Sequence, residues 1–257
     1  CTQQPQHWPC LQCHCHRLEI GQQMAIKALI FDVFGTLVDW RSSIAADAEK
    51  LLSGLQLQTD WYAFADAWRD EYQPAMEKVR SGQRGFCTLD ELHRGNLDIV
   101  LQRLGWQHVD EAVREELNQC WHHLDQWGEV AQGLAQLRKK FVLAPCSNGH
   151  IALMVHLARH NHWHWDAITG AEIAQDYKPQ PIVYQASAKA LGCLPEETMM
   201  VAAHSEDLLA AARAGLKTAF IARPDEHGPG LGETVSKYPV DFSASDLLDL
   251  ARLLDCN

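Results

Sequence analysis

The sequence predicts an α/β fold in which a doubly wound parallel sheet carries a helical insertion. Two observations predict this fold: five short apolar runs without polar alternation, and helical stretches between the last four of them. Continuous apolarity is typical of parallel strands that are covered on both faces. Regular alternation of strands and helices indicates a doubly wound sheet. The chain has 257 residues, which suits one large domain with an inserted smaller one.

The predicted strands span residues 27–33, 141–147, 167–173, 198–204 and 217–223. The helical stretches between the last four strands cover 152–160, 181–192 and 206–216. Two of these stretches run into a glycine, Gly192 and Gly215, as helices commonly do at their C-terminal ends. The end of the chain, 244–255, predicts one amphipathic helix.

Residues 41–125 contain no strong strand pattern and are rich in helix formers and aromatic side chains. We therefore expect a helical domain that is inserted into a core made of residues 24–40 and 126–257. Residues 1–23 differ from the rest, because they carry four of the nine cysteines and no apolar core for a signal peptide. Their Cys10-Leu11-Gln12-Cys13-His14 matches the spacing of haem attachment and, loosely, of a metal cluster. Without an export signal, we favour a disordered or non-native extension.

Charge and composition exclude several classes of function. The net charge of −11 argues against nucleic-acid binding, which usually needs a basic face. No apolar run approaches the roughly 18 residues of a membrane-spanning helix, and no long basic run predicts a membrane-surface role. The cysteines are odd in number and unevenly spaced, so they do not form a secreted disulfide framework. We expect a cytoplasmic protein.

Polar side chains follow four of the predicted strands at the points where the strands end. They are Asp32 and Thr36 after the first strand, Ser147 and Asn148 after the second, Lys178 after the third, and His204 and Asp207 after the fourth. Open α/β sheets bind ligands beyond the carboxyl ends of their strands. Polar groups from four strands that converge there, with a carboxylate and a lysine among them, predict a catalytic site.

The same residues carry a family resemblance. The motifs "FDVFGTLVD", "SNG", "YKP" and "AAHSEDLLAAARAGLKTAFIARPDE", in this order and spacing, resemble those of the haloacid dehalogenase superfamily. Within the superfamily they are similar to the type II, or L-2-haloacid, dehalogenases over about residues 25–240. The resemblance implies a Rossmann-like core with an α-helical cap domain and a site between the two. Homodimers are frequent in the family, so a homodimer is also an expectation.

Phe34 and Ala203 decide which chemistry the resemblance implies. In phosphatases of the superfamily, an acid–base aspartate stands two residues after the nucleophile, and an acid in the fourth motif helps to hold Mg²⁺; here those positions are Phe34 and Ala203. A halide leaves as a stable anion and needs neither group. The resemblance therefore implies hydrolytic, metal-independent dehalogenation of small 2-haloalkanoic acids to 2-hydroxy acids, without a cofactor. A phosphatase and a catalytically idle binding protein are the alternatives.

The resemblance also implies residue roles. Asp32 would attack the halogen-bearing carbon, giving an aspartyl ester. Thr36 would orient Asp32, Lys178 would keep it ionised, and Asp207 would activate the hydrolytic water. His204 stands where relatives often have asparagine, and would hold water or bind halide.

Substrate binding is implied for a second group of residues. The amides of Val33 and Phe34, with Ser147 and Asn148, would bind the substrate carboxylate, and Tyr184 would line the pocket. The family also uses an arginine from the first cap helices. Three arginines compete for that role, and we expect Arg80 rather than Arg69 or Arg84.

Overall fold

A computed structural model describes residues 25–55, 57 and 59–256, and shows a six-stranded sheet. Its order is β3-β2-β1-β4-β5-β6 and every neighbouring pair is parallel, so the predicted parallel sheet is confirmed. The strands are β1 (Ala28–Phe31), β2 (Val142–Ser147), β3 (Thr169–Gly170), β4 (Thr198–Ala202), β5 (Lys217–Ile221) and β6 (Phe242–Ala244).

The register of the central strands brings their carboxyl ends to one edge. Phe31, the last residue of β1, pairs with Pro145 of β2 and with Val201 of β4. From β1 the chain adds β2 and β3 on one side of the sheet, and then β4, β5 and β6 on the other side. The crevice between β1 and β4 is therefore the topological switch point, where ligands bind in such folds. Residues that follow β1, β2 and β4 therefore surround a common crevice.

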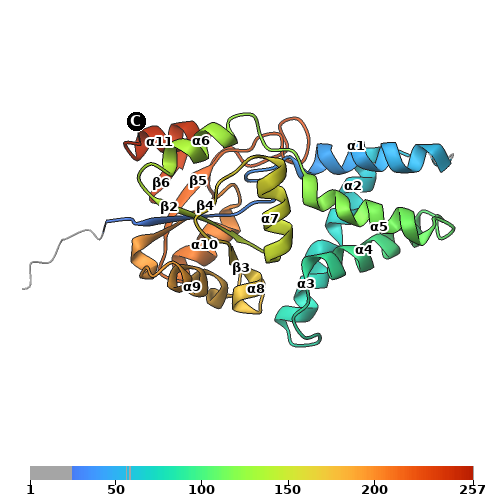
Figure 1. The fold of residues 1–257 in the computed structure, drawn as a ribbon, viewed down its shortest axis with the longest axis horizontal. Helices are drawn as coiled ribbons and strands as arrows, with labels where there is room; N and C mark the ends of the chain where they lie inside the picture. The colour runs from blue at the N-terminus through green and yellow to red at the C-terminus, as the bar shows by residue number, and fades with distance from the viewer. Residues whose placement is uncertain (1–24, 56, 58, 257) are drawn as a thin grey trace, which may run out of the picture.

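Helices cover both faces of the sheet, because alternate strand residues point to opposite sides. Leu29 of β1 belongs to one buried apolar cluster and the adjacent Ile30 to the other. The first cluster includes α6 (Val130–Leu137), α7 (Ile151–His160) and α11 (Leu247–Leu253). The second includes α9 (Pro181–Ala190) and α10 (Ser205–Arg213). Figure 1 shows α6 beside α11 on one side and α9 and α10 on the other.

The cap helices are the elements from α1 to η2, which the chain inserts between β1 and α6. They are α1 (Trp40–Leu52), η1 (Ser53–Leu55), α2 (Trp61–Asp70), α3 (Tyr72–Arg80), α4 (Leu89–Arg103), α5 (Glu111–Gln119) and η2 (Cys120–His123). They extend from the sheet to one side (Figure 1). Side-chain caps begin several of them: Thr88 and Glu91 form a reciprocal capping box at α4.

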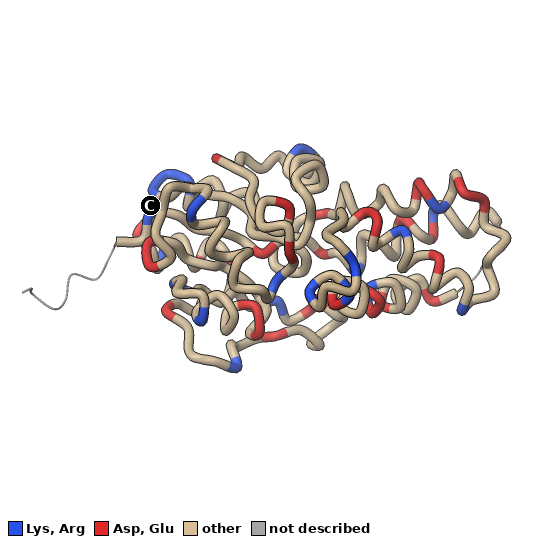
Figure 2. The backbone as a smooth tube through the Cα atoms, turned by 90° about the horizontal axis from the view of Figure 1, so that it is seen from below, with Lys and Arg blue, Asp and Glu red and all other residues tan. Residues whose placement is uncertain are grey.

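Acidic and basic positions are interspersed along the cap helices and the core (Figure 2). No helix in the described part of the chain combines the length and apolarity that a membrane crossing requires.

Two sequence predictions are corrected. The predicted strand over 167–173 is a strand only at Thr169–Gly170, and α8 (Ala171–Ala174) follows at once. Gly170 has a φ of 117° and lies so close to β2 that a Cβ atom would sit 2.4 Å from the Ser147 carbonyl oxygen, so the backbone turns away there. The predicted helix over 244–255 begins only at Leu247, because Phe242–Ala244 extends the sheet as β6.

Gly133 tests the contact between α6 and α11. A Cβ atom at Gly133 would lie 2.4 Å from the Cβ of Leu247. We expect Gly133→Ala to lower the free energy of unfolding, because overpacking costs about 1–3 kcal/mol and outweighs the gain of roughly 1 kcal/mol that alanine brings to a helix. Gly95→Ala is the matched control, since Gly95 lies in α4 with no atom within 4 Å of the added methyl, and should stabilise the protein. Urea unfolding measures the free energy of unfolding of both variants. Equal changes in the two variants would contradict tight packing between α6 and α11.

Candidate active site

The carboxylate of Asp32 lies just beyond the end of β1 and is only 6% exposed. The hydroxyl of Thr36 donates to Asp32 Oδ2 over 2.7 Å. The same hydroxyl oxygen accepts the amide of Ala203, beyond β4, at 2.9 Å. Thr36 therefore fixes the orientation of the Asp32 carboxylate and links the ends of two adjacent strands.

Lys178 joins two carboxylates. Its ammonium group donates to Asp32 Oδ1 over 2.7 Å and to Asp207 Oδ2 over 2.6 Å, and its side chain is buried. The hydroxyl of Tyr184 donates to the other oxygen of Asp207 over 2.5 Å. The backbone amide of Lys178 donates to Asn148 Oδ1 over 2.8 Å. This network brings together residues that follow β1, β2, β3 and β4.

His204 joins Asp32 to a carboxylate that the sequence analysis missed, Glu226. The Nδ1 atom of His204 lies 3.1 Å from Asp32 Oδ2, and its Nε2 lies 2.9 Å from Glu226 Oε2. Glu226 is 2% exposed and also accepts the indole N–H of Trp40 at 3.2 Å. Because both ring nitrogens face carboxylate oxygens, both act as donors, which requires the imidazolium form.

Asp32 and His204 shift each other's pKa. Burial alone would raise the pKa of Asp32, but the charges of Lys178 and His204 and their hydrogen bonds lower it well below its ordinary range. Burial alone would lower the pKa of His204, but Glu226 and Asp32 raise it to about 10. At neutral pH, Asp32 is therefore an anion and His204 a cation.

Gly35 makes room for Glu226. Its φ of 83° lies in the left-handed region that favours glycine. A Cβ atom at this position would lie 2.0 Å from Glu226 Oε1. The glycine of the first motif therefore leaves the space in which Glu226 pairs with His204.

A cavity of about 640 Å³ opens onto these groups. Its walls include Asp32, Phe34, Arg69, Tyr72, Asn148, Lys178, His204, Asp207 and Glu226. The guanidinium of Arg69 lies 4.0 Å from the centre of the Tyr72 ring and 5.3 Å from that of Trp40. Its Nη1 atom is buried and has no hydrogen-bond partner among the described residues. Arg69 therefore presents an uncommitted positive group to the cavity.

The structure places three predicted binding residues away from the cavity wall. Arg80 donates to the carbonyl of Lys178 over 2.9 Å and to Glu77 over 2.9 Å, and does not line the cavity, so the geometry favours Arg69 over Arg80 as the binding arginine. Tyr184 is fully buried behind Asp207 instead of lining the cavity. Ser147 is also fully buried, and its hydroxyl accepts the amide of Gly149 at 3.0 Å.

The backbone beneath the cavity offers further donors. The side chain of Val33 is buried, while that of Phe34 forms part of the cavity wall. Within the described part of the chain, the amides of Val33 and Phe34 donate to no other group. Two adjacent free amides at the end of a strand are suited to bind an anion.

Comparison with known proteins agrees with this geometry. Residues 26–215 match the family described as haloacid dehalogenase-like hydrolase. The chain belongs to this family. It is 42% identical to the defluorinating L-2-haloacid dehalogenase Rha0230, covering 90% of this chain and 95% of that one with a TM-score of 0.87. It is 25% identical to an (S)-2-haloacid dehalogenase of Pseudomonas putida, over 77% of this chain and 85% of the relative.

A phosphatase is also among the relatives: a phosphoglycolate phosphatase of Aquifex aeolicus (strain VF5) is 26% identical, over 90% of this chain and 97% of that protein. The relatives with 42% identity are L-2-haloacid dehalogenases, so the chain groups with them within the family. The predicted resemblance and the Rossmann-like fold are confirmed.

Glu226 could have been found from the sequence by the rule that found the other residues. It lies five residues beyond the end of β5, so its carboxylate reaches the same edge of the sheet. Arg69 is harder to find, because the apolar residues of α2 show which helix face is buried but not which residue lies beside the cavity.

The pairing with Glu226 can be tested through the pKa of His204. We expect Glu226→Gln to move that pKa from about 10 toward the ordinary value of about 6.5, because one of two carboxylates is lost. A raised pKa in the folded state stabilises the protein fully below pH about 6.5, and this stabilisation disappears as pH rises through about 10. NMR titration of the histidine ring signals measures the pKa, with His204→Gln to assign them. A pKa near 6.5 in the wild-type protein would contradict the arrangement.

Proposed function

We propose that the chain is a hydrolytic dehalogenase that converts small 2-haloalkanoic acids to 2-hydroxy acids through an aspartyl ester. One observation carries the proposal: Asp32 is held as an anion at the cavity, and the position two residues later is an aromatic ring, Phe34. The 42% identical relatives, named as L-2-haloacid dehalogenases, support the same substrate class.

In the first step, an oxygen of Asp32 attacks the halogen-bearing carbon. A carbon–oxygen bond forms while the carbon–halogen bond breaks, and the halide leaves with the bonding electrons. The substrate carboxylate would be bound by the free amides of Val33 and Phe34 and by the amide group of Asn148. Arg69 would face the departing halide or the carboxylate, because its guanidinium lies in the cavity wall and its buried Nη1 has no hydrogen-bond partner among the described residues.

In the second step, water attacks the carbonyl carbon of the Asp32 ester. Asp207 would orient this water and accept its proton, since Tyr184 and Lys178 hold its carboxylate beside Asp32. Thr36, Lys178 and His204 donate to the Asp32 oxygens and would stabilise the negative charge that develops there. The ester bond to the product breaks, the product oxygen takes up the proton from Asp207, and the second proton of the water is released to solvent, so that Asp32 returns as a carboxylate.

The phosphatase alternative fits the residues less well. Phe34 and Ala203 replace the acid–base and metal-binding carboxylates, and the Lys178 ammonium lies between Asp32 and Asp207. These groups do not fit Mg²⁺, so we propose a reaction that is independent of metal. An idle binding protein is disfavoured because the network around Asp32 retains both a nucleophile and a group to activate water.

A cytoplasmic location is part of the same proposal. The five cysteines in the described part of the chain are free thiols, as expected in a reducing compartment. A homodimer remains a prediction from the family resemblance.

The central test is halide release. We expect the wild-type protein to release halide from chloroacetate and from 2-chloropropionate in the presence of EDTA. Asp32→Asn should lower the rate at least about a thousandfold, because the nucleophile is lost. Asp110→Asn is the matched control, since Asp110 is exposed and makes no side-chain cap. Absence of release from chloro, bromo and fluoro substrates would refute the proposal, and phosphate release with Mg²⁺ would favour the alternative.

The two arginines make a second test. We expect Arg69→Lys to raise KM for 2-chloropropionate about tenfold to a hundredfold, consistent with the roughly 1.5–3 kcal/mol of a hydrogen bond to a charged group. Arg80→Lys should change KM less than about threefold, because Arg80 faces the Lys178 carbonyl outside the cavity wall. Steady-state kinetics on both variants decides the matter; a larger effect at Arg80 would restore the sequence-based choice.

A further inference from the structure

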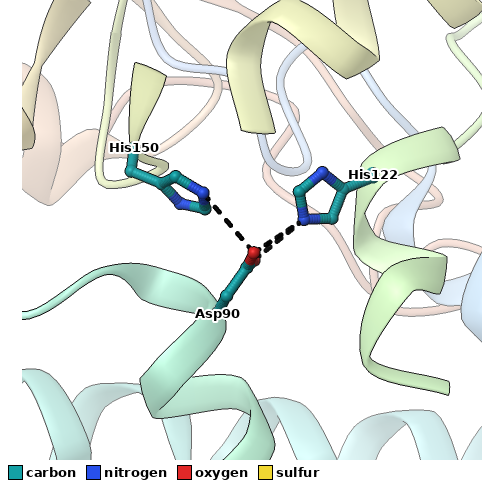
Figure 3. A group of neighbouring side chains, drawn as sticks. All are labelled: Asp90, His122 and His150. Atoms are coloured by element: carbon teal, nitrogen blue, oxygen red, sulfur yellow. Dashed lines mark hydrogen bonds and ion pairs between the residues drawn. The ribbon is translucent and has the colours of Figure 1, made fainter. Parts of the chain in front are cut away.

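A second cluster of polar side chains lies between the cap helices and the core. Asp90 belongs to the first turn of α4, His122 to η2, and His150 stands at the N-terminus of α7. Figure 3 shows the two imidazole rings converging on the carboxylate from different elements. None of the three residues lines the cavity at Asp32. The cluster is therefore separate from the site described above.

The distances fit a common divalent ion. His122 Nε2 lies 2.9 Å from each oxygen of Asp90, and His150 Nε2 lies 3.4 Å from Asp90 Oδ2. One ligand atom from each residue can be chosen so that all three lie within 4.8 Å of one another. Bonds of about 2.0–2.2 Å around one tetrahedral zinc ion separate neighbouring ligand atoms by roughly 3.3–3.6 Å. To share an ion, His122 Nε2 and the Asp90 oxygens would move apart by a few tenths of an ångström, while the contact of His150 Nε2 with Asp90 Oδ2 already has a suitable length.

The buried ring of His150 has few polar contacts. Its side chain is almost fully buried, and its Nδ1 has no hydrogen-bond partner in the described part of the chain. Its Nε2 reaches the Asp90 carboxylate only at 3.4 Å. Nδ1 is not the atom that faces Asp90, so the contact that an ion would change is the long one at Nε2, which coordination would replace.

His122 is already oriented for ligation. Its Nδ1 lies 2.7 Å from Nδ1 of His156, which is exposed on α7. When Nδ1 donates to His156, the Nε2 atom of His122 carries the lone pair and faces Asp90. An outer hydrogen bond that fixes the tautomer in this way is typical of histidine ligands.

We propose that Asp90, His122 and His150 bind a zinc-class divalent ion that ties the cap helices to the core. Two imidazole nitrogens and one carboxylate favour Zn²⁺ and its borderline neighbours over Mg²⁺, which prefers oxygen ligands. With three protein ligands, a fourth position remains for water. The ion has no part in the dehalogenation steps, so the proposal stands independently of the proposed function.

The ion would act on the seam between the two parts of the molecule. His122 belongs to the last of the cap helices, and α7 packs against η2. His150 is also two residues from Asn148, which lines the cavity. Zinc is therefore expected to stabilise the folded protein, because it binds a site that exists only when the cap helices and the core are together.

Zinc binding to the full chain tests the proposal. Protein stripped with EDTA and dialysed would be titrated with Zn²⁺ in a calorimeter, and its thermal midpoint would be measured with and without the metal. Cysteines and histidines in residues 1–24 can also bind zinc, so the informative quantity is the difference between variants in the same chain. Co²⁺ spectra add a check, because thiolate ligands give an intense charge-transfer band that histidine and aspartate lack.

Asp90→Asn and His150→Ala should each remove one equivalent of bound Zn²⁺, or weaken its affinity more than about tenfold. Both should also abolish the zinc-induced rise in the thermal midpoint. His160→Ala is the matched control, because His160 is exposed at the other end of α7 and pairs with Asp125. Asp90→Asn preserves the side-chain shape, and so covers the case in which His150→Ala does not fold.

Identical zinc stoichiometry and thermal shift in wild type and both variants would overturn the proposal and leave a hydrogen-bonded cluster. Halide release in EDTA reports separately on the proposed function. An active protein whose zinc binding is unchanged by the variants refutes only the metal site. An inactive protein that loses one zinc with each variant refutes only the dehalogenase.

Discussion

The buried negative charge of Asp32 is the constraint on which the rest of the site depends. An unpaired carboxylate at such a position costs several kcal/mol, unless opposite charges and hydrogen bonds are held around it. Here Lys178, His204 and Thr36 satisfy it, and each comes from a different segment. Holding them at bonding distance requires the strands to end at one level, which is what the register of β1 with β2 and β4 achieves. The fold thus provides counter-charges to one carboxylate.

The partners of Asp32 are themselves paired, so the charges alternate along a row. In order, the row is Asp207, Lys178, Asp32, His204 and Glu226. Three anions and two cations leave one excess negative charge, which would repel an anionic substrate. Arg69 and the free backbone amides beyond β1 compensate for it. The outer carboxylates therefore keep Lys178 and His204 charged. Arg69, whose buried Nη1 has no hydrogen-bond partner among the described residues, remains available for the ligand.

The sheet and most of this row were predictable, because both follow from chain-local signals. Unbroken apolar runs locate parallel strands, and polar residues at their ends locate the rim. β3 and β6 were misjudged because they are only two and three residues long, too short for a clear pattern. The sequence could not decide between Arg80 and Arg69 for a different reason: both lie in short amphipathic helices, and only tertiary packing determines which of the two lies at the cavity.

Phe34 links the chemistry of the site to the attachment of the cap helices. Its ring packs edge-on against Trp121, with the ring centres 6.0 Å apart, and against His93 at 6.4 Å. A carboxylate in place of Phe34 would enter this aromatic layer, with the Arg69 guanidinium 5.8 Å from the centre of the present ring, and Ala203 would still stand in place of the second acid. Restoring one acidic residue would therefore not recreate the chemistry of a phosphatase. Because His122 follows Trp121 directly, the η2 turn that packs against Phe34 also carries a ligand of the proposed zinc site.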